Sequence, residues 1–248
     1  MKYLIPKAED SVVTLSYRKT LTIDPTKVSA TLTDFPVLVD IYDTDLHDPN
    51  KVQADGDDIA FVVNGTPVDY ELELFNQNYN STHAHLVAWV RVPTLSSTTP
   101  TVIEMYYGNP NCGPLENPQG VWGDGYAAVW HLNNDPSAEI VVDSSANNMD
   151  GTPLGMEQTN LITGVADGAL DFDGADDRIR TGPIDSDSWT AITVSGWINI
   201  DDTGVDRFIS KEAGSGGLPI VWMVGHNGTK INCIITTCLL YTSPSPRD

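Results

Sequence analysis

The sequence predicts an all-β protein made of two antiparallel β-sandwich domains of the jelly-roll kind, of which the second is truncated. Apolar and polar residues alternate in several short runs, which is the pattern of half-buried strands. Turn-forming pairs separate these runs, and no amphipathic helix of useful length occurs. Many short strands at regular spacing are typical of sandwiches and barrels.

Four runs carry the alternation most clearly. Each places an apolar residue at every second position, so that one face of the strand can meet a core. The apolar positions are Val37, Val39 and Ile41; Ile59, Phe61 and Val63; Leu86, Ala88, Val90 and Val92; and Ile103, Met105 and Tyr107. Turns between strands are indicated by Asp24-Pro25, Asp55-Gly56, Asn64-Gly65, Asn109-Pro110 and Asn227-Gly228.

A change of composition divides the chain. Residues 111–120 hold prolines and glycines without hydrophobic periodicity, which is typical of a linker. We therefore predict an N-terminal segment at 1–10, a first sandwich at 11–110 and a partial second domain at 121–237. Residues 238–248, CLLYTSPSPRD, resemble a translated sequencing adapter, so we expect a metagenomic gene fragment whose last residues are not native.

The charge of the chain excludes some classes of partner. Its 248 residues carry a formal net charge of −21, and the pI is about 4.2. A phosphate backbone is attracted by Lys and Arg, so nucleic acid is not expected as a partner, and anionic membrane surfaces are disfavoured likewise. No stretch approaches the ~18 apolar residues of a transmembrane helix, so no membrane insertion is expected, and residues 1–10 show no signal peptide.

Six short motifs follow one another in a set order across residues 11–110. They are Tyr17-Arg18-Lys19, Phe35-Pro36-Val37-Leu38-Val39, Asp55-Gly56-Asp57-Asp58-Ile59, Tyr70-Glu71-Leu72-Glu73, Trp89-Val90-Arg91-Val92-Pro93 and Tyr106-Tyr107-Gly108-Asn109. In this order they resemble a prokaryotic family known as domain of unknown function 2341. The resemblance implies a β-sandwich found in large secreted or surface proteins, with no assigned activity.

A second set of motifs follows in residues 121–237. It comprises Val129-Trp130-His131-Leu132, Val142-Asp143-Ser144-Ser145, the stretch 168–174 and the stretch 192–198. These motifs resemble the opening half of a laminin-G-like, or concanavalin A-like, lectin/glucanase domain. The resemblance implies a lectin-like jelly roll in which residues 192–198 form a strand. Because the domain is truncated, any site that its later strands would build is missing from this chain.

Catalysis is not predicted. Concanavalin-like glucanases place two carboxylates across the scissile bond, and the string Glu-x-Asp-x-x-Glu that supplies them in retaining members does not occur here. Glu71 and Glu73 face one way on a strand, about 7 Å apart, a spacing that general acid/base chemistry can use. We prefer the alternative, a solvated or salt-bridged strand face, and interpret His131 as a partly buried structural histidine.

An acidic turn is the clearest feature with metal-binding chemistry. Four carboxylates lie within seven residues, at Asp171, Asp173, Asp176 and Asp177. Calcium takes six to eight oxygen ligands, so such a turn is chemically able to bind it. Asp143 and Asn147, in a second polar turn, are expected to converge on the same edge. Calcium is therefore the only cofactor suggested, and the alternative is a solvated turn whose aspartates bond locally.

One tryptophan is a candidate for ligand binding. Sugar rings stack on exposed aromatic faces, which buries apolar area while the hydroxyl groups keep polar partners. In the predicted strand, Trp197 shares the more polar face with Ser195 and Asn199, which predicts a glycan-binding surface. The alternative is a tryptophan that covers the sheet against a neighbouring loop.

Together these features predict a non-catalytic binding or adhesion protein, secreted or at the surface of a prokaryotic cell. Its lectin-like module would take glycan or surface-protein ligands. Two alternatives stay open: an accessory fragment of a larger carbohydrate-active enzyme of the glycoside hydrolase kind, and a purely structural surface protein.

Overall fold

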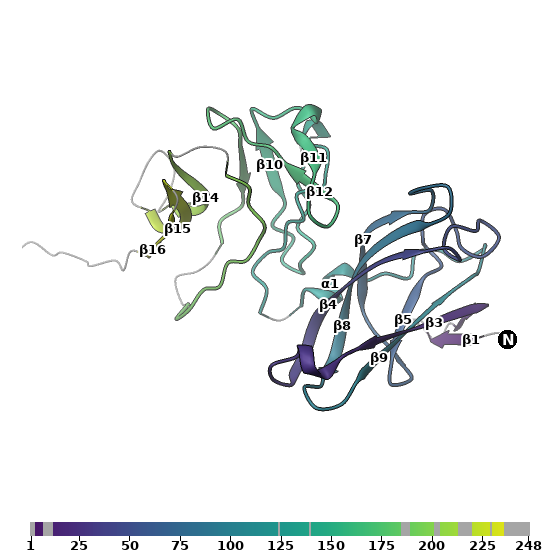
Figure 1. The fold of residues 1–248 in the computed structure, drawn as a ribbon. Coiled ribbons are helices and arrows are strands. Elements are labelled where there is room, and N and C mark those ends of the chain that lie inside the picture. The colour runs from purple at the N-terminus through teal and green to yellow at the C-terminus, as the bar shows by residue number, and fades with distance from the viewer. Residues whose placement is uncertain are drawn as a thin grey trace, which may run out of the picture. The chain divides into compact units, whose positions relative to one another are not determined.

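In the computed structural model of the chain, the described residues are 3–6, 12–123, 125–138, 140–184, 189–200, 204–212, 220–228 and 230–235. The chain divides into two compact units, Met1–Gly182 and Pro183–Asp248. Both units are built from antiparallel strands, and the helical segments in the described part are short (Figure 1). The predicted all-β class is therefore confirmed.

The first unit is built around a β-sandwich of two antiparallel sheets (Figure 1). One sheet has the order β3-β9-β5-β6, with bounds Tyr17–Ile23, Thr101–Tyr107, Ala60–Val63 and Thr66–Pro67. The other has the order β4-β8-β7, with bounds Leu32–Asp43, Ala84–Leu95 and Tyr70–Asn76. Strand β4 is thus an edge strand of its sheet.

The alternating residues predicted from the sequence line the core of this sandwich. The buried core includes Val39 of β4, Phe61 and Val63 of β5, Leu86, Ala88, Val90 and Val92 of β8, and Ile103, Met105 and Tyr107 of β9. The intervening residues of β4 point the other way, and Leu38 and Tyr42 are exposed. In the register of the sheet, Tyr42 lies opposite His85. The outer face of β4 therefore remains accessible at this end.

A hairpin covers part of the opposite sheet. Strands β1 (Tyr3–Pro6) and β2 (Val12–Leu15) pair antiparallel. Side chains of this hairpin pack with outward-facing residues of β5 and β9, in a cluster of Ile5, Leu15, Ala60, Val62 and Tyr106. The N-terminal segment thus contributes a strand to the first unit.

Residues 111–182 continue the first unit with short elements. Helix α1 spans Pro118–Val121. Four strands pair antiparallel in two ribbons: β10 (Gly151–Leu154) with β13 (Arg178–Thr181), and β11 (Leu161–Thr163) with β12 (Gly168–Leu170). The described residues also form the 3-10 turns η1 (Pro25–Lys27), η2 (Pro136–Ala138) and η3 (Gln158–Asn160). Among the described residues no helix has the length and apolar character needed to cross a membrane.

The segment 111–120, predicted as a linker, is bonded to the sandwich. The Asn117 N–H donates to the carbonyl of Tyr70 at 2.9 Å, and Asn117 Nδ2 donates to Asp69 Oδ1 at 2.8 Å. Arg91 of β8 donates to the carbonyl of Gly120 at 2.9 Å. The chain that follows β9 is therefore held against β7 and β8.

The second unit contains one described sheet of the order β14-β15-β16, with bounds Val205–Glu212, Ile220–Asn227 and Lys230–Ile235. The predicted strand at 192–198 is wrong, because residues 191–200 adopt no strand. A strand needs a neighbouring backbone to satisfy its N–H and C=O groups, and no described strand pairs with this stretch. Residues 236–248, including the adapter-like 238–248, lie outside the described residues.

Candidate functional site

The acidic turn lies between β12 and β13. One carboxylate oxygen from each of Asp173, Asp176 and Asp177 lies within 4.8 Å of the others, and Asp171 is not a member of this group. The turn is also held by its own bonds. Asp173 Oδ1 accepts three backbone N–H groups, that of Ala175 at 2.8 Å, and these bonds lower the pKa of Asp173. The three carboxylates match the ligand chemistry of a divalent cation, and backbone donors also bond within the turn.

Asp143 and Asn147 organise a separate turn. Asp143 is buried, and its carboxylate oxygens accept four donors at 2.7–2.9 Å: the N–H groups of Val129, Ser145 and Met149, and the hydroxyl of Ser145. The amide of Asn147 donates to the carbonyls of Tyr126 and Ala127. A carboxylate has about four lone-pair sites, so these bonds occupy Asp143 fully. The structure brings neither residue into the Asp173 group.

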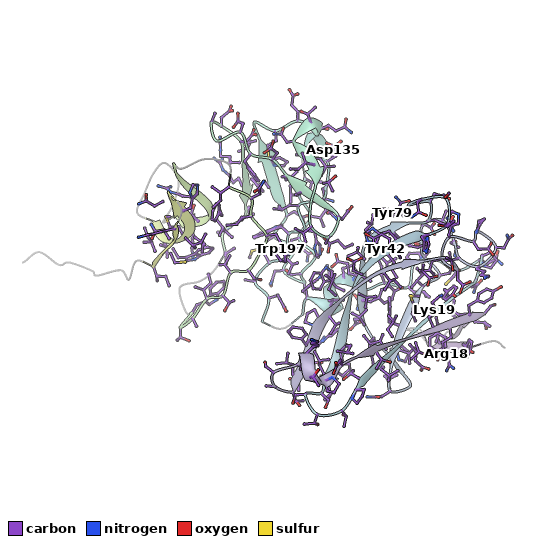
Figure 2. All side chains as sticks on the ribbon, viewed as in Figure 1. Arg18, Lys19, Tyr42, Tyr79, Asp135 and Trp197 are labelled. Atoms are coloured by element: carbon purple, nitrogen blue, oxygen red, sulfur yellow. The ribbon has the colours of Figure 1, made fainter. Side chains whose placement is uncertain are left out.

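Trp197 belongs to the second unit and is accessible there (Figure 2). Its side chain is 83% exposed, and Ser195 and Asn199 are exposed as well. Because the stretch is not a strand, the three residues do not share the face of a sheet. Trp197 therefore offers a ring for stacking without the flat sheet surface that the sequence predicted around it.

Glu71 and Glu73 of β7 come together with His131, which sequence reasoning had treated separately. His131 lies between the two carboxylates: its Nε2 is 3.0 Å from Glu71 Oε2, and its Nδ1 is 3.4 Å from Glu73 Oε2. All three side chains are largely buried. A β-bulge interrupts the register of β7 with β8 between Leu72 and Leu74, at the position of Glu73.

Three further side chains complete this arrangement. Glu71 accepts the indole N–H of Trp122 and the hydroxyl of Ser144, each at 2.5 Å. Glu73 accepts the indole N–H of Trp89 at 2.6 Å. We name the whole set the carboxylate network, consisting of Glu71, Glu73, Trp89, Trp122, His131 and Ser144. It joins β7 and β8 to residues 122–144.

Burial and charge act in opposite directions on the carboxylate network. Burial lowers the pKa of His131, but the hydrogen bond and charge of Glu71, with the charges of Glu73 and Asp167, outweigh it and raise that pKa above 6.5. Burial raises the pKa of Glu71, but the hydrogen bond and charge of His131, with bonds from Ser144 and Trp122, bring that pKa below 4.5. Both shifts favour the ion pair between His131 and Glu71.

The cavity beside the carboxylate network is small. It measures about 180 Å³ and is lined in part by Glu71, Glu73, His131 and Asn133. Ligand sites usually occupy about 300–1,000 Å³. Both glutamates are already bonded to protein donors within this space. The geometry therefore supports the interpretation of Glu71 and Glu73 as a salt-bridged strand face.

Two tyrosines form an exposed aromatic cluster at one end of the β4-β8-β7 sheet, and Figure 2 shows them side by side. Tyr42 of β4 and Tyr79 of the β7–β8 turn are 53% and 49% exposed, with ring centroids 4.9 Å apart and planes at 55°. The ring of His85 stacks on Tyr42 at 4.2 Å and 11°. We name Tyr42 and Tyr79 the tyrosine platform.

Buried and hydrogen-bonded neighbours fix the tyrosine platform in place. His85 is buried, and its Nε2 lies 2.8 Å from Asp40 Oδ1. The turn that carries Tyr79 is closed by Asn80, whose N–H donates to the carbonyl of His83 at 3.2 Å and whose side-chain oxygen accepts the N–H of His83 at 2.9 Å. Both rings are thus presented by an ordered backbone.

The sequence analysis did not predict the tyrosine platform, although the sequence does indicate that Tyr42 is exposed. Tyr42 stands in line with Asp40 on the polar face of β4, opposite the core face that holds Val39. A tyrosine on the polar side of an alternating strand indicates an exposed ring. The position of Tyr79 beside it depends on the pairing of β4 with β8, a long-range contact that no local pattern encodes.

Comparison with protein families adds a finding about residues 55–192. They match the family model described as Domain of unknown function (DUF2341), and this is more than half of the chain. The matched stretch includes strands β5 to β13 and the whole carboxylate network, and it extends beyond residue 110, where the sequence interpretation ended the first domain. No curated protein and no solved structure matches the chain.

Proposed function

The chain belongs to the DUF2341 family of domains of unknown function, and on this premise we propose that it is a non-catalytic binding or adhesion module with a glycan or protein ligand. It acts outside the cytoplasm, secreted or at the surface of a prokaryotic cell. The family name supplies no activity, so function has to be inferred from the chemistry of the side chains.

The observation that carries this proposal is the tyrosine platform. Aromatic residues dominate the energetics of binding surfaces, where their large rings bury apolar area against a ligand. Tyr42 and Tyr79 expose their rings side by side from a rigid sheet. A preorganised surface of this kind loses little conformational entropy when a ligand binds.

The state of the buried carboxylates supports a non-catalytic role. A glycosidase needs one carboxyl group free to protonate the leaving oxygen and a second free to act on the sugar. Glu71 and Glu73 are instead bonded to His131 and to two indoles in a space of about 180 Å³. Substrate access would require these bonds to break.

A lectin-like second half belongs to the same proposal. It is supported by the sequence motifs at 129–132, 142–145 and 168–174, and by the exposure of Trp197. In such a module Trp197, with Ser195 and Asn199, would supply a further ligand-binding surface.

Calcium at the acidic turn is a second proposal, favoured by the grouping of Asp173, Asp176 and Asp177. Its role would be structural, since a cation would tie the turn between β12 and β13 and offset the repulsion of adjacent carboxylates. It would act on the stability of a binding module rather than on any chemical step.

The proposed function is tested by measuring binding and turnover together. The whole chain is incubated with immobilised neutral polysaccharides and with purified surface-layer protein, and both retention on the support and release of reducing ends are measured. We expect retention without release. Release of reducing ends would show an enzyme fragment, and absence of retention on every support would favour the purely structural surface protein.

A further inference from the structure

We propose that the tyrosine platform is a binding site for neutral pyranose chains, with Asp40 as the polar group that orients the sugar. This deepens the proposed function, on which it rests, by assigning the site and the class of ligand. It places a glycan contact on the outer face of the first sandwich, in addition to the surface proposed at Trp197.

The rings of the platform match the dimensions of a saccharide. Centroids 4.9 Å apart are about the length of one pyranose residue, and the two ring planes are tilted by 55° to each other. One face of the Tyr42 ring is covered by His85. The half of Tyr42 that stays exposed is therefore available for the C–H face of a sugar, which is the apolar part of that ligand.

Asp40 supplies the polar partner that a sugar hydroxyl needs. Its side chain is 46% exposed, and its Oδ1 is engaged by His85 at 2.8 Å. No hydrogen bond to Oδ2 is found among the described residues, so this oxygen can accept hydroxyl groups of a ligand. Asp40 and Tyr42 share the outer face of β4, two residues apart, which places ring and carboxylate beside each other.

The negative charge of the site and of the whole chain favours neutral over anionic glycans as ligands. Asp40 lies beside the platform, and the whole chain carries a net charge of −21. A uronic acid or a sulfated sugar would meet repulsion both at the site and over long range. A neutral hexose or pentose chain avoids this cost and can still donate its hydroxyl protons to Asp40.

The size of the platform favours a glycan over a folded protein. A stable protein interface buries about 800 Å² on each partner and has a fully desolvated apolar centre. The platform offers two rings next to exposed polar residues such as Asn76 and Asn78. Two stacking faces and a carboxylate are enough for a short stretch of saccharide.

The test uses isothermal titration calorimetry of the whole chain with neutral hexasaccharides of glucose, xylose, mannose and N-acetylglucosamine, and with an oligogalacturonate as the anionic comparison. We expect at least one neutral ligand to bind and the anionic one not to bind. Tyr42→Ala and Tyr79→Ala should each weaken binding at least roughly tenfold, which corresponds to about 1.4 kcal/mol. Tyr42→Phe keeps the ring and should weaken binding less than Tyr42→Ala.

Two further variants separate the site from the function. Phe35→Ala removes another exposed ring of β4 and should leave affinity unchanged. Trp197→Ala tests the other aromatic surface. If neutral glycans bind and only Trp197→Ala weakens them, the platform is not the site, yet a glycan-binding function stands. If no neutral glycan binds while surface-layer protein does, the ligand class is wrong. If neither ligand is retained, the proposed function and this inference fail together.

Discussion

His131 is a single side chain on which the attachment of residues 122–144 to the sandwich depends. It lies between Glu71 and Glu73, where all three side chains are largely buried and an unpaired charge is very costly. The intact ion pair can contribute little to the free energy of unfolding, because the cost of desolvating the charges offsets their attraction. Removal of one partner is costly, because it leaves a buried charge without a counter-charge. The consequences for stability should therefore depend on pH.

The first prediction is that stability declines as the pH rises above neutral, and that His131→Gln removes this decline. The raised pKa of His131 gives a contribution that is complete below about 6.5 and is lost as the pH rises through the folded value. The lowered pKa of Glu71 gives a contribution present above about 4.5 and lost as the pH falls through its folded value. Urea unfolding between pH 3 and 9 measures both limbs.

Near pH 6, His131→Gln should lower the free energy of unfolding by about 3 kcal/mol, the typical cost of breaking a buried pair. His83→Gln, at a histidine of the β7–β8 turn, is the matched control and should keep the wild-type pH profile. An alkaline limb that is equally steep in His131→Gln would show that another group causes it.

At the scale of elements, one buried aspartate joins two turns that are distant in the sequence. Asp58 is 1% exposed, and its Oδ1 accepts the N–H of Gln53 at 3.0 Å. Its Oδ2 accepts the N–H groups of Gly108 and Asn109 at 3.0 and 2.8 Å. Two of the motifs that carried the family resemblance, 55–59 and 106–109, are therefore in contact with each other. The contact joins the turn before β5 to the end of β9.

The second prediction is that Asp58→Ala costs about 3 kcal/mol of stability, because it leaves buried N–H groups without an acceptor. Asp55→Ala is the control: its carboxylate accepts one N–H in an exposed position, so the cost should stay within about 1 kcal/mol. Chemical unfolding of both variants measures the two losses of stability and tests the prediction. Equal costs would mean that the bonds of Asp58 contribute no more than those of a surface turn.

The third prediction concerns the acidic turn between β12 and β13. If calcium binds the folded chain alone, a concentration of about 100 times Kd stabilises it by roughly 2.7 kcal/mol. Asp173→Ala should remove most of that gain, and Asp171→Ala, outside the grouped carboxylates, should keep it. Melting temperatures in millimolar calcium and in chelator measure the effect. A shift of equal size in Asp173→Ala would place the ion elsewhere.

At this scale, the sequence predicts the features that depend on local patterns and misses those that depend on contacts between distant residues. The alternation of Phe61 with Val63, or of Val90 with Val92, is a local pattern, and it located the core strands correctly. The same pattern at 192–198 failed, because a strand also requires a partner. The carboxylate network could not be assembled from sequence, since Glu71 and His131 are sixty positions apart and meet only through the fold.

At the scale of the whole molecule, the first unit extends well past the sandwich. Residues 111–182 belong to it by their contacts, and the family match at 55–192 covers the sandwich strands β5 to β9 and this continuation. Asn117 bonds to β7, Trp122 is buried, and Ser144 bonds to Glu71. These contacts cover the outer face of β7 and β8, which would otherwise expose Trp89 and two buried carboxylates.

The last prediction is that residues 1–182 unfold in one cooperative transition and that residues 1–110 are markedly less stable. The shorter fragment lacks the indole of Trp122, and loss of a buried tryptophan side chain alone costs about 3–5 kcal/mol. In the longer fragment, Trp122→Ala should reproduce a large part of the difference, because that ring packs on Trp89 and donates to Glu71. Phe172→Ala, at an exposed ring of the same fragment, is the control and should cost little. Urea unfolding followed by tryptophan fluorescence and by circular dichroism tests both points, since coincident curves indicate a single cooperative unit. Equal midpoints for the two fragments would mean that the sandwich is complete by residue 110 and that the carboxylate network adds a cover without adding stability.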